Sequence, residues 1–168
     1  MGQVIEVRFE EITPGKLGFR PEHVVSVAER VMMGKPLFPL VGKKSKYNPG
    51  MHVTLDPGNS RIIYAMMAGQ ESAPMFVAGS DKDLIPYNLF YPILGESVNY
   101  ANKAIQNRWD ECEIIARHSG VKNFRDYFDR LLERHPFLGT VTTFLEYYAK
   151  NRDFYSDPSK TIGGLEDL

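Results

Sequence analysis

The chain opens with a regular alternation of apolar and polar residues. Ile5, Val7 and Phe9 fall on one face of an extended chain, and charged residues fall on the other face. An alternation with a period of two is typical of a strand that has one buried side. The pattern therefore predicts a strand over residues 4–12.

A different period follows this strand. Between Pro21 and Gly34, apolar residues recur three and four positions apart, as they do along one face of a helix. Proline suits the first turn of a helix, and glycine suits the position just after its end. The sequence therefore predicts an amphipathic helix between these two residues.

The middle of the chain is rich in glycine and proline, and it contains short apolar runs between frequent turns. Residues 51–55 and 61–65 carry β-branched and aromatic side chains and flank an Asp-Pro-Gly-Asn turn. Runs of this kind on either side of a turn are predicted to pair as a hairpin. Several short strands separated by turns indicate a small barrel or a curled sheet.

Helical periodicity returns after a polar linker at residues 79–83. A long helix is predicted from Ser97 to about Ser119, with an aromatic, irregular stretch before it. A second helix is predicted from Asn123 to Pro136, and a third is predicted around residues 141–149. Short connections between such helices favour antiparallel packing.

These patterns together predict an α+β protein made of four parts. They are a strand and helix at residues 1–34, a small barrel at 35–80, an antiparallel helical domain at 84–153 and a tail at 154–168.

Composition limits the classes of protein that remain. With 168 residues, 43% hydrophobic and 24% charged, the chain has the composition of a globular protein rather than a disordered one. Its net charge of −1 disfavours a broadly basic nucleic-acid-binding protein, although basic residues can be gathered on one surface. No apolar run reaches the roughly 18 residues that a membrane span needs, so no membrane partner is expected.

Catalytic and metal-binding patterns are weak. Cys112 is the single cysteine, which excludes an internal disulfide, and a reducing compartment such as the cytoplasm is expected. His118 lies six positions further on, so a helix would place the two side chains on different faces. Cys112 also belongs to an apolar stripe, and the acidic residues around it, 110–113, are interpreted as a solvated face. We therefore expect no catalytic residue, no metal, no cofactor and no enzymatic activity.

One cluster of basic residues stands out. Lys43, Lys44 and Lys46 lead into a turn that begins at Tyr47, and Arg61 is placed close to them by the predicted hairpin. Lysine and arginine side chains contact phosphates, and an aromatic ring can stack on a base. These five residues are the candidate RNA-binding site. The alternative is a solvated loop whose lysines keep the edge of a sheet soluble.

A resemblance to a known family covers about residues 42–70. The bacterial and organellar large-subunit ribosomal protein twenty-seven family has a similar core, and the residues that carry the resemblance are Lys46-Tyr47-Asn48-Pro49-Gly50, Val53, Gly58, Tyr64-Ala65 and Gly69. The chain departs from the family at Asn48, where histidine is usual, and at Thr54, where glycine is usual. It also carries about two extra residues in the hairpin and lacks the basic tail of the family.

The resemblance implies a fold, partners and a location. They are an SH3-like β-barrel, rRNA near the tRNA acceptor end, and a mitochondrial ribosome. The C-terminal helices have more aromatic residues than one thin helical layer usually buries, so some of them are expected to contact neighbouring ribosomal proteins. The expected function is therefore a structural constituent of the large ribosomal subunit. The alternative is a non-ribosomal protein-interaction or regulatory module without catalytic activity.

Overall fold

The structure is a computed structural model, and it describes residues 2–37, 39–54, 58–79 and 109–168. The strands are β1 (Gln3–Arg8), β2 (Ile12–Thr13), β3 (Leu40–Lys44), β4 (His52–Thr54) and β5 (Ser72–Val77). The helices are α1 (Pro21–Met32), α2 (Gly58–Met67), α4 (Phe124–Arg134), α5 (Val141–Lys150) and α6 (Arg152–Tyr155), and residues 109–118 are also helical. Short 3₁₀ turns are η1 (Phe9–Glu11), η4 (Pro136–Gly139) and η5 (Leu165–Asp167). The predicted α+β class is confirmed.

The strands form one mixed sheet in the order β1-β5-β3-β4-β2. Strand β5 pairs with β1 in the antiparallel direction and with β3 in the parallel direction, while β4 pairs antiparallel with β3 and parallel with β2. Within the described residues, β1 and β2 are the two edges of the sheet and do not pair with each other. The sheet is therefore open, and a closed barrel is not formed by these strands.

The sheet is nevertheless strongly curled. Its two edge strands are separated in the chain by η1 alone. The edges of a flat five-stranded sheet would lie about 19 Å apart, whereas a 3₁₀ turn of this length spans only about 8 Å. The far edges must therefore bend toward each other, which agrees with the curled sheet expected from the short strands.

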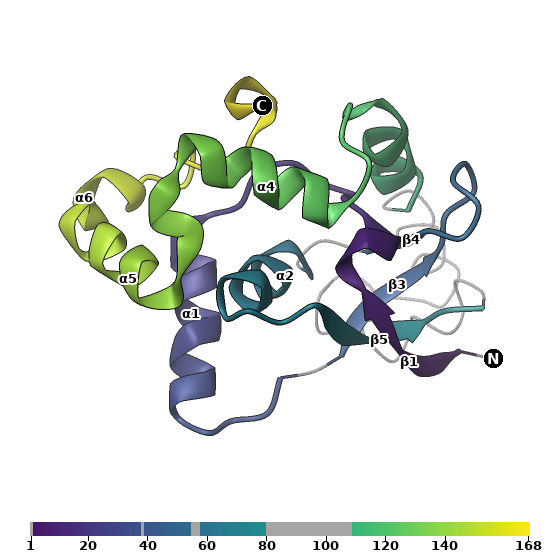
Figure 1. Cartoon of the computed structure of the whole chain (residues 1–168), viewed down its shortest axis with the longest axis horizontal. Coiled ribbons are helices and arrows are strands. Elements are labelled where there is room, and N and C mark those ends of the chain that lie inside the picture. Colours follow the sequence, from purple (N-terminus) through teal and green to yellow (C-terminus); the bar gives the residue numbers. More distant parts are fainter. Residues whose placement is uncertain (1, 38, 55–57, 80–108) are drawn as a thin grey trace, which may run out of the picture.

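Helix α2 lies at the centre of the molecule. It packs against β3 and β5 on one side and against α1 and α4 on the other. Figure 1 shows α1, α2 and α4 grouped together beside the sheet. Buried residues from the sheet and from these helices share one hydrophobic core, with Phe9, Val24, Ile62, Met75 and Phe124 among its members.

The predicted hairpin is wrong in its second half. Residues 61–65 lie within α2, so only residues 52–54 of the expected pair form a strand. Helix α2 is buried on nearly every side, including Ile62, Ile63 and Met66. A helix that is buried on all sides has apolar residues all round, so its sequence lacks the single apolar stripe by which helices are usually predicted. The adjacent isoleucines are also typical of a strand.

The predicted helices near the two ends of the chain are confirmed. Helix α1 begins at Pro21, and Gly34 follows its end with φ of +70°. Helix α4 begins after Asn123 as predicted, and α5 covers the third predicted helix. The described part of the long helix, residues 109–118, ends where it was expected to end, and residues 80–108 lie outside the described part. The antiparallel packing of the three predicted helices therefore stays a prediction.

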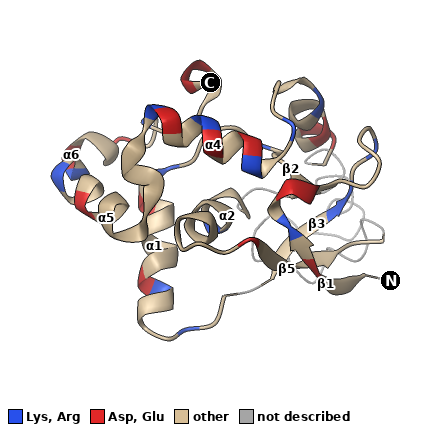
Figure 2. Ribbon diagram, viewed as in Figure 1, with Lys and Arg blue, Asp and Glu red and all other residues tan. Residues whose placement is uncertain are grey.

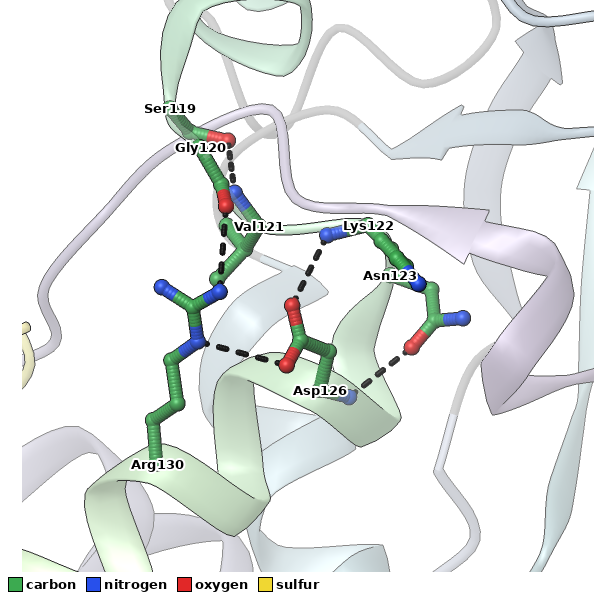
Figure 3. A network of polar contacts seen from close by, with 7 residues as sticks. All are labelled: Ser119, Gly120, Val121, Lys122, Asn123, Asp126 and Arg130. Atoms are coloured by element: carbon green, nitrogen blue, oxygen red, sulfur yellow. Dashed lines mark hydrogen bonds and ion pairs between the residues drawn. The ribbon is translucent and has the colours of Figure 1, made fainter.

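A network of polar contacts fixes the start of α4 (Figure 3). The side-chain oxygen of Asn123 accepts a hydrogen bond from the Asp126 N–H at 2.8 Å. The Asp126 carboxylate accepts from the Lys122 N–H at 3.0 Å and from the Arg130 side chain at 3.2 Å. Arg130 also donates to the carbonyl of Gly120, at 3.2 Å. The connection between residues 109–118 and α4 is therefore held at both ends.

Residues 154–168 do not form a free tail. Tyr155 and Ile162 are buried in the common core, and Ile162 forms a two-way backbone bridge with Phe19. The domain boundaries at residues 34, 80, 84 and 154 stay predictions. In the structure, however, core residues come from all four predicted parts.

Candidate nucleic-acid interface

The structure brings four of the five predicted site residues together. Lys43 and Lys44 end β3, and Lys46 and Tyr47 lie in the loop that connects β3 to β4. Arg61 lies elsewhere, on α2, where its side chain donates to the carbonyl of Pro39 at 3.2 Å. Burial lowers the pKa of the Arg61 guanidinium below its ordinary value. The structure therefore does not bring Arg61 to the lysines as the predicted hairpin would, and an RNA-binding role for this residue stays a prediction.

The lysines line an open groove of about 450 Å³. Lys43, Lys44 and Lys46 share it with His52, which is the first residue of β4. The far wall comes from β1 and from the end of β5, and its residues are Gln3, Ile5, Val77, Ala78 and Gly79. The sheet order explains this arrangement because β5 lies between β1 and β3. The result is an open groove that three lysine residues and one histidine line.

A buried carboxylate holds the loop that carries Lys46 and Tyr47. Glu113 is only 2% exposed, and it comes from the helical segment 109–118. Its carboxylate accepts from the Ser45 hydroxyl at 3.2 Å and from the Lys46 N–H at 3.1 Å. The Ser45 hydroxyl oxygen in turn accepts from the N–H groups of Tyr47 and Asn48. The loop is thus tied to the helix through successive backbone groups.

Glu113 contradicts the interpretation of residues 110–113 as a solvated face. Asp110 and Glu111 are exposed, but Glu113 and Cys112 are buried. The sequence offered no signal for this role because the partner loop lies almost 70 residues earlier in the chain. Cys112 is buried as expected, which places its thiol away from solvent.

Charged and aromatic side chains also link the groove to this helical segment. The Lys43 ammonium lies 5.0 Å from the centre of the Trp109 ring, and Arg117 lies 4.8 Å from the centre of the Tyr47 ring. Lys46 forms an ion pair with Asp110 at 3.5 Å. Both partners of that pair are about half exposed, so an incoming phosphate can compete for the lysine at little cost. Figure 2 shows Lys and Arg residues along β3 and the loop after it.

A second hollow, of about 210 Å³, lies at the start of α2. Lys16, Arg20 and His23 contribute to its walls. Asn59 has a structural role there because its side-chain amide donates to the carbonyl of Lys16 at 2.7 Å. Arg20 is paired with Glu22. Basic residues therefore also line a hollow in a different part of the molecule from the groove.

Among residues 2–37, 39–54, 58–79 and 109–168, no group of three or more histidine, cysteine, aspartate or glutamate side chains is arranged to hold a metal ion. No helix in that part of the chain has the length and apolar character required to cross a bilayer.

Comparisons with models of known protein families and with curated proteins find no match to this chain.

Proposed function

We propose that this protein is a non-enzymatic RNA-binding protein that contacts phosphates through the groove at the end of β3. The setting that the ribosomal resemblance favours is the large subunit of an organellar ribosome, where the groove would contact rRNA. The C-terminal helices would then contact neighbouring proteins, and the groove would lie near the tRNA acceptor end.

The observation that carries this proposal is the convergence of three lysines on one groove. Lys43, Lys44 and Lys46 come from a strand and a loop, yet all three line the same surface with His52. Ammonium groups spaced along a groove neutralise successive phosphates and release counterions, which is the main source of affinity for nucleic acids. A net charge of −1 is compatible with this proposal because the basic residues are concentrated locally.

The family part of the proposal rests on the loop rather than on the hairpin. The Lys46-to-Gly50 turn connects β3 to β4, whereas Tyr64 and Ala65 are helical. We also propose that the fold is related to an SH3-like barrel. The support for this relation is the strong curl of the open sheet, whose two edge strands are joined by η1 alone.

The test is to change Lys43, Lys44 and Lys46 together to glutamine and to measure RNA binding at several salt concentrations. Each phosphate contact releases close to one counterion, so the slope of log K against log salt should fall in magnitude by about 2 to 3. Fluorescence anisotropy of a labelled RNA oligomer gives both the affinity and the slope.

The matched control removes the same charge from the helices. Arg134, Lys150 and Arg152 are exposed, and they lie on α4, α5 and α6, away from β3 and β4 in Figure 1. Changing these three to glutamine should leave the slope almost unchanged. Arg130 is unsuitable as a control because it binds Asp126 and Gly120. Equal effects of the two triple variants would mean that affinity follows total charge, and the groove would lose its role.

A further comparison uses the hollow at the start of α2. Arg20→Gln changes a basic residue of that hollow and leaves the groove intact. Under the proposal, this variant binds RNA as the unchanged protein does. If Arg20→Gln lost RNA binding while the lysine variant kept it, the binding site would lie at the start of α2, and the groove assignment would be wrong.

A second candidate is a protein-interaction module without RNA. The end of α1 exposes Met32 at 75% and Met33 at 60%, and Val31 and Leu37 are exposed beside them. An apolar hollow of about 140 Å³ adjoins this end of the helix. Exposed apolar side chains gathered in one place are typical of protein-binding surfaces. Absence of RNA binding at low salt would favour this candidate.

A further inference from the structure

We infer that Tyr47 and Arg117 form a stacking platform for one unpaired base, so that the groove binds single-stranded rather than duplex RNA. This inference rests on the proposed RNA-binding function, and it names the class of RNA that the same site would bind.

The geometry of the pair supports a platform. Tyr47 follows Lys46 directly in the chain, and Lys46 lines the groove, so the two residues share the loop beside the groove. The Tyr47 residue is 50% exposed, although Arg117 lies 4.8 Å from its ring centre. A guanidinium over an aromatic ring holds the ring by a cation–π contact. Half of the residue nevertheless remains open to a ligand.

The platform is also held in a fixed position. The Tyr47 N–H donates to the Ser45 hydroxyl oxygen at 3.3 Å, and that hydroxyl donates to Glu113. Arg117 lies one helical turn after Glu113 in the same helical segment. The ring and the guanidinium are thus both tied to residues 109–118. An aromatic group that is held in place before binding loses little conformational entropy when a base stacks on it.

The chemistry selects unpaired bases. In an RNA duplex the faces of the bases are covered by their neighbours, and the deep, narrow major groove excludes side chains. Only a base that has left the stack can lie on an exposed tyrosine. Bases of every kind have a suitable face, so the platform would distinguish strand state more than sequence. The adjacent lysines would meanwhile contact the phosphates of neighbouring nucleotides.

The test separates stacking from phosphate contact with three labelled RNAs of equal length. They are an ordinary single strand, a single strand with abasic positions and a blunt duplex.

Removal of one stacking side chain from single-strand binders weakens binding by roughly 5-fold to 150-fold. We therefore expect Tyr47→Leu to weaken binding of the ordinary strand by at least about 5-fold. We expect it to leave binding of the abasic strand unchanged, and we expect Tyr47→Phe to bind as the unchanged protein does. Arg117→Gln should also weaken binding of the ordinary strand, but by a smaller factor than Tyr47→Leu.

The chain offers a matched control in a second exposed aromatic. Phe154 is 56% exposed, and Lys160 lies 5.4 Å from its ring centre. Phe154→Leu removes an equivalent ring on α6 and should not change binding of any of the three RNAs. Because Tyr47 and Phe154 are both exposed, the melting temperature of each variant is expected to stay close to that of the unchanged protein.

The outcomes distinguish the two proposals. Suppose that the lysine triple variant weakens binding of both the ordinary and the abasic strand. If Tyr47→Leu then weakens binding of both strands equally, or of neither strand, the stacking inference is wrong, and the groove remains the proposed RNA-binding site. Duplex binding as tight as single-strand binding would also overturn the inference. If the lysine variant binds all three RNAs as the unchanged protein does, the groove itself is not the site.

Discussion

At the scale of single residues, two buried polar side chains organise distant parts of the chain. Glu113 receives hydrogen bonds from Ser45 and from the backbone of Lys46. Tyr127 accepts from the Gly18 N–H at 3.0 Å and donates to the Gly163 carbonyl at 2.8 Å. Glu113 thus accepts two hydrogen bonds from one loop, and Tyr127 connects two segments that are also joined by the Phe19–Ile162 backbone bridge. Removal of either side chain should therefore cost more than a surface change.

Glu113→Ala should loosen the loop that carries Lys46 and Tyr47. The variant leaves two donors without their acceptor, which should lower the free energy of unfolding by about 1 to 3 kcal/mol. RNA binding should weaken as well because the loop is no longer held. Denaturant unfolding and anisotropy measure the two effects.

The sign of the binding change is informative here. Glu113→Ala removes a negative charge near the lysines, so charge alone would make RNA bind more tightly. Asp110→Asn provides the contrast because Asp110 pairs with Lys46 at 3.5 Å at the surface. That variant should tighten binding. If Glu113→Ala bound RNA more tightly, the hydrogen bonds from Glu113 to the loop would have no role in RNA binding.

Tyr127→Phe should lower the free energy of unfolding by about 1 to 3 kcal/mol at neutral pH because it removes both hydrogen bonds of the hydroxyl. Burial also raises the pKa of Tyr127 to about 12, from its ordinary value of 10.0. The neutral hydroxyl is therefore favoured in the folded state. This contribution to stability is complete below pH 10 and is lost as the pH rises through about 12.

Denaturant unfolding between pH 9 and pH 11.5 measures this contribution. The unchanged protein should lose stability more steeply than Tyr127→Phe over this range. The comparison is necessary because burial also raises the pKa of Tyr155, which remains in both proteins. Parallel curves for the two proteins would contradict the assignment to Tyr127.

At the scale of elements, the caps of the helices decide where they begin. Thr140 and Thr143 form a reciprocal capping box at the start of α5. At the start of α4, Asn123 caps the helix and Asp126 joins it to the residues before it. Figure 3 shows that Arg130 extends this network back to Gly120. The two helices therefore have defined starts that do not depend on the core alone.

Asn123→Ala should lower the free energy of unfolding by about 1 kcal/mol, the usual loss for a helix cap. Asp126→Ala should cost at least as much because the Lys122 N–H and the Arg130 side chain both lose their acceptor. Thermal unfolding of the two variants and of the double variant measures these losses. Losses that add without coupling would contradict a connected network.

The elements also show what the sequence could predict. Helices α1 and α4 were predicted because each has one apolar face and a recognisable start, and β1 was predicted from its alternation. Helix α2 was missed because it is buried on nearly every side, which removes the periodic signal. Of the site, the three lysines and Tyr47 could be found because they are neighbours in the chain. Glu113 and Arg117 could not, since tertiary packing alone brings them to the loop.

At the scale of the whole molecule, charge is arranged unevenly. The three lysines of the groove are gathered at one end of the sheet, although the chain as a whole carries a net charge of −1. Such a protein should bind RNA by one face and present its other surfaces to solvent or to protein partners. RNA should therefore bind in one orientation relative to the protein, with the groove facing the RNA.

The protein is expected to sediment with large ribosomal subunits when cell extracts from its source are fractionated on a density gradient at low salt. The lysine triple variant should move toward the top of the gradient at a lower salt concentration than the unchanged protein, because it makes fewer phosphate contacts. The position of known subunit proteins provides the reference. A protein that stays at the top while those proteins migrate would contradict the ribosomal setting.

The order of strands in the sheet has a consequence for how the protein folds during synthesis. Strand β1 is made first, yet its partner β5 ends at residue 77, and β2 has its partner in β4. The sheet therefore cannot grow by adding each new strand to the previous one. The β2 edge can pair once β4 has been synthesised, at residue 54, whereas the β1 edge must wait until residue 77. Pairing between such distant segments slows folding, so the nascent N-terminal strand is the part most exposed to wrong pairing and to chaperones.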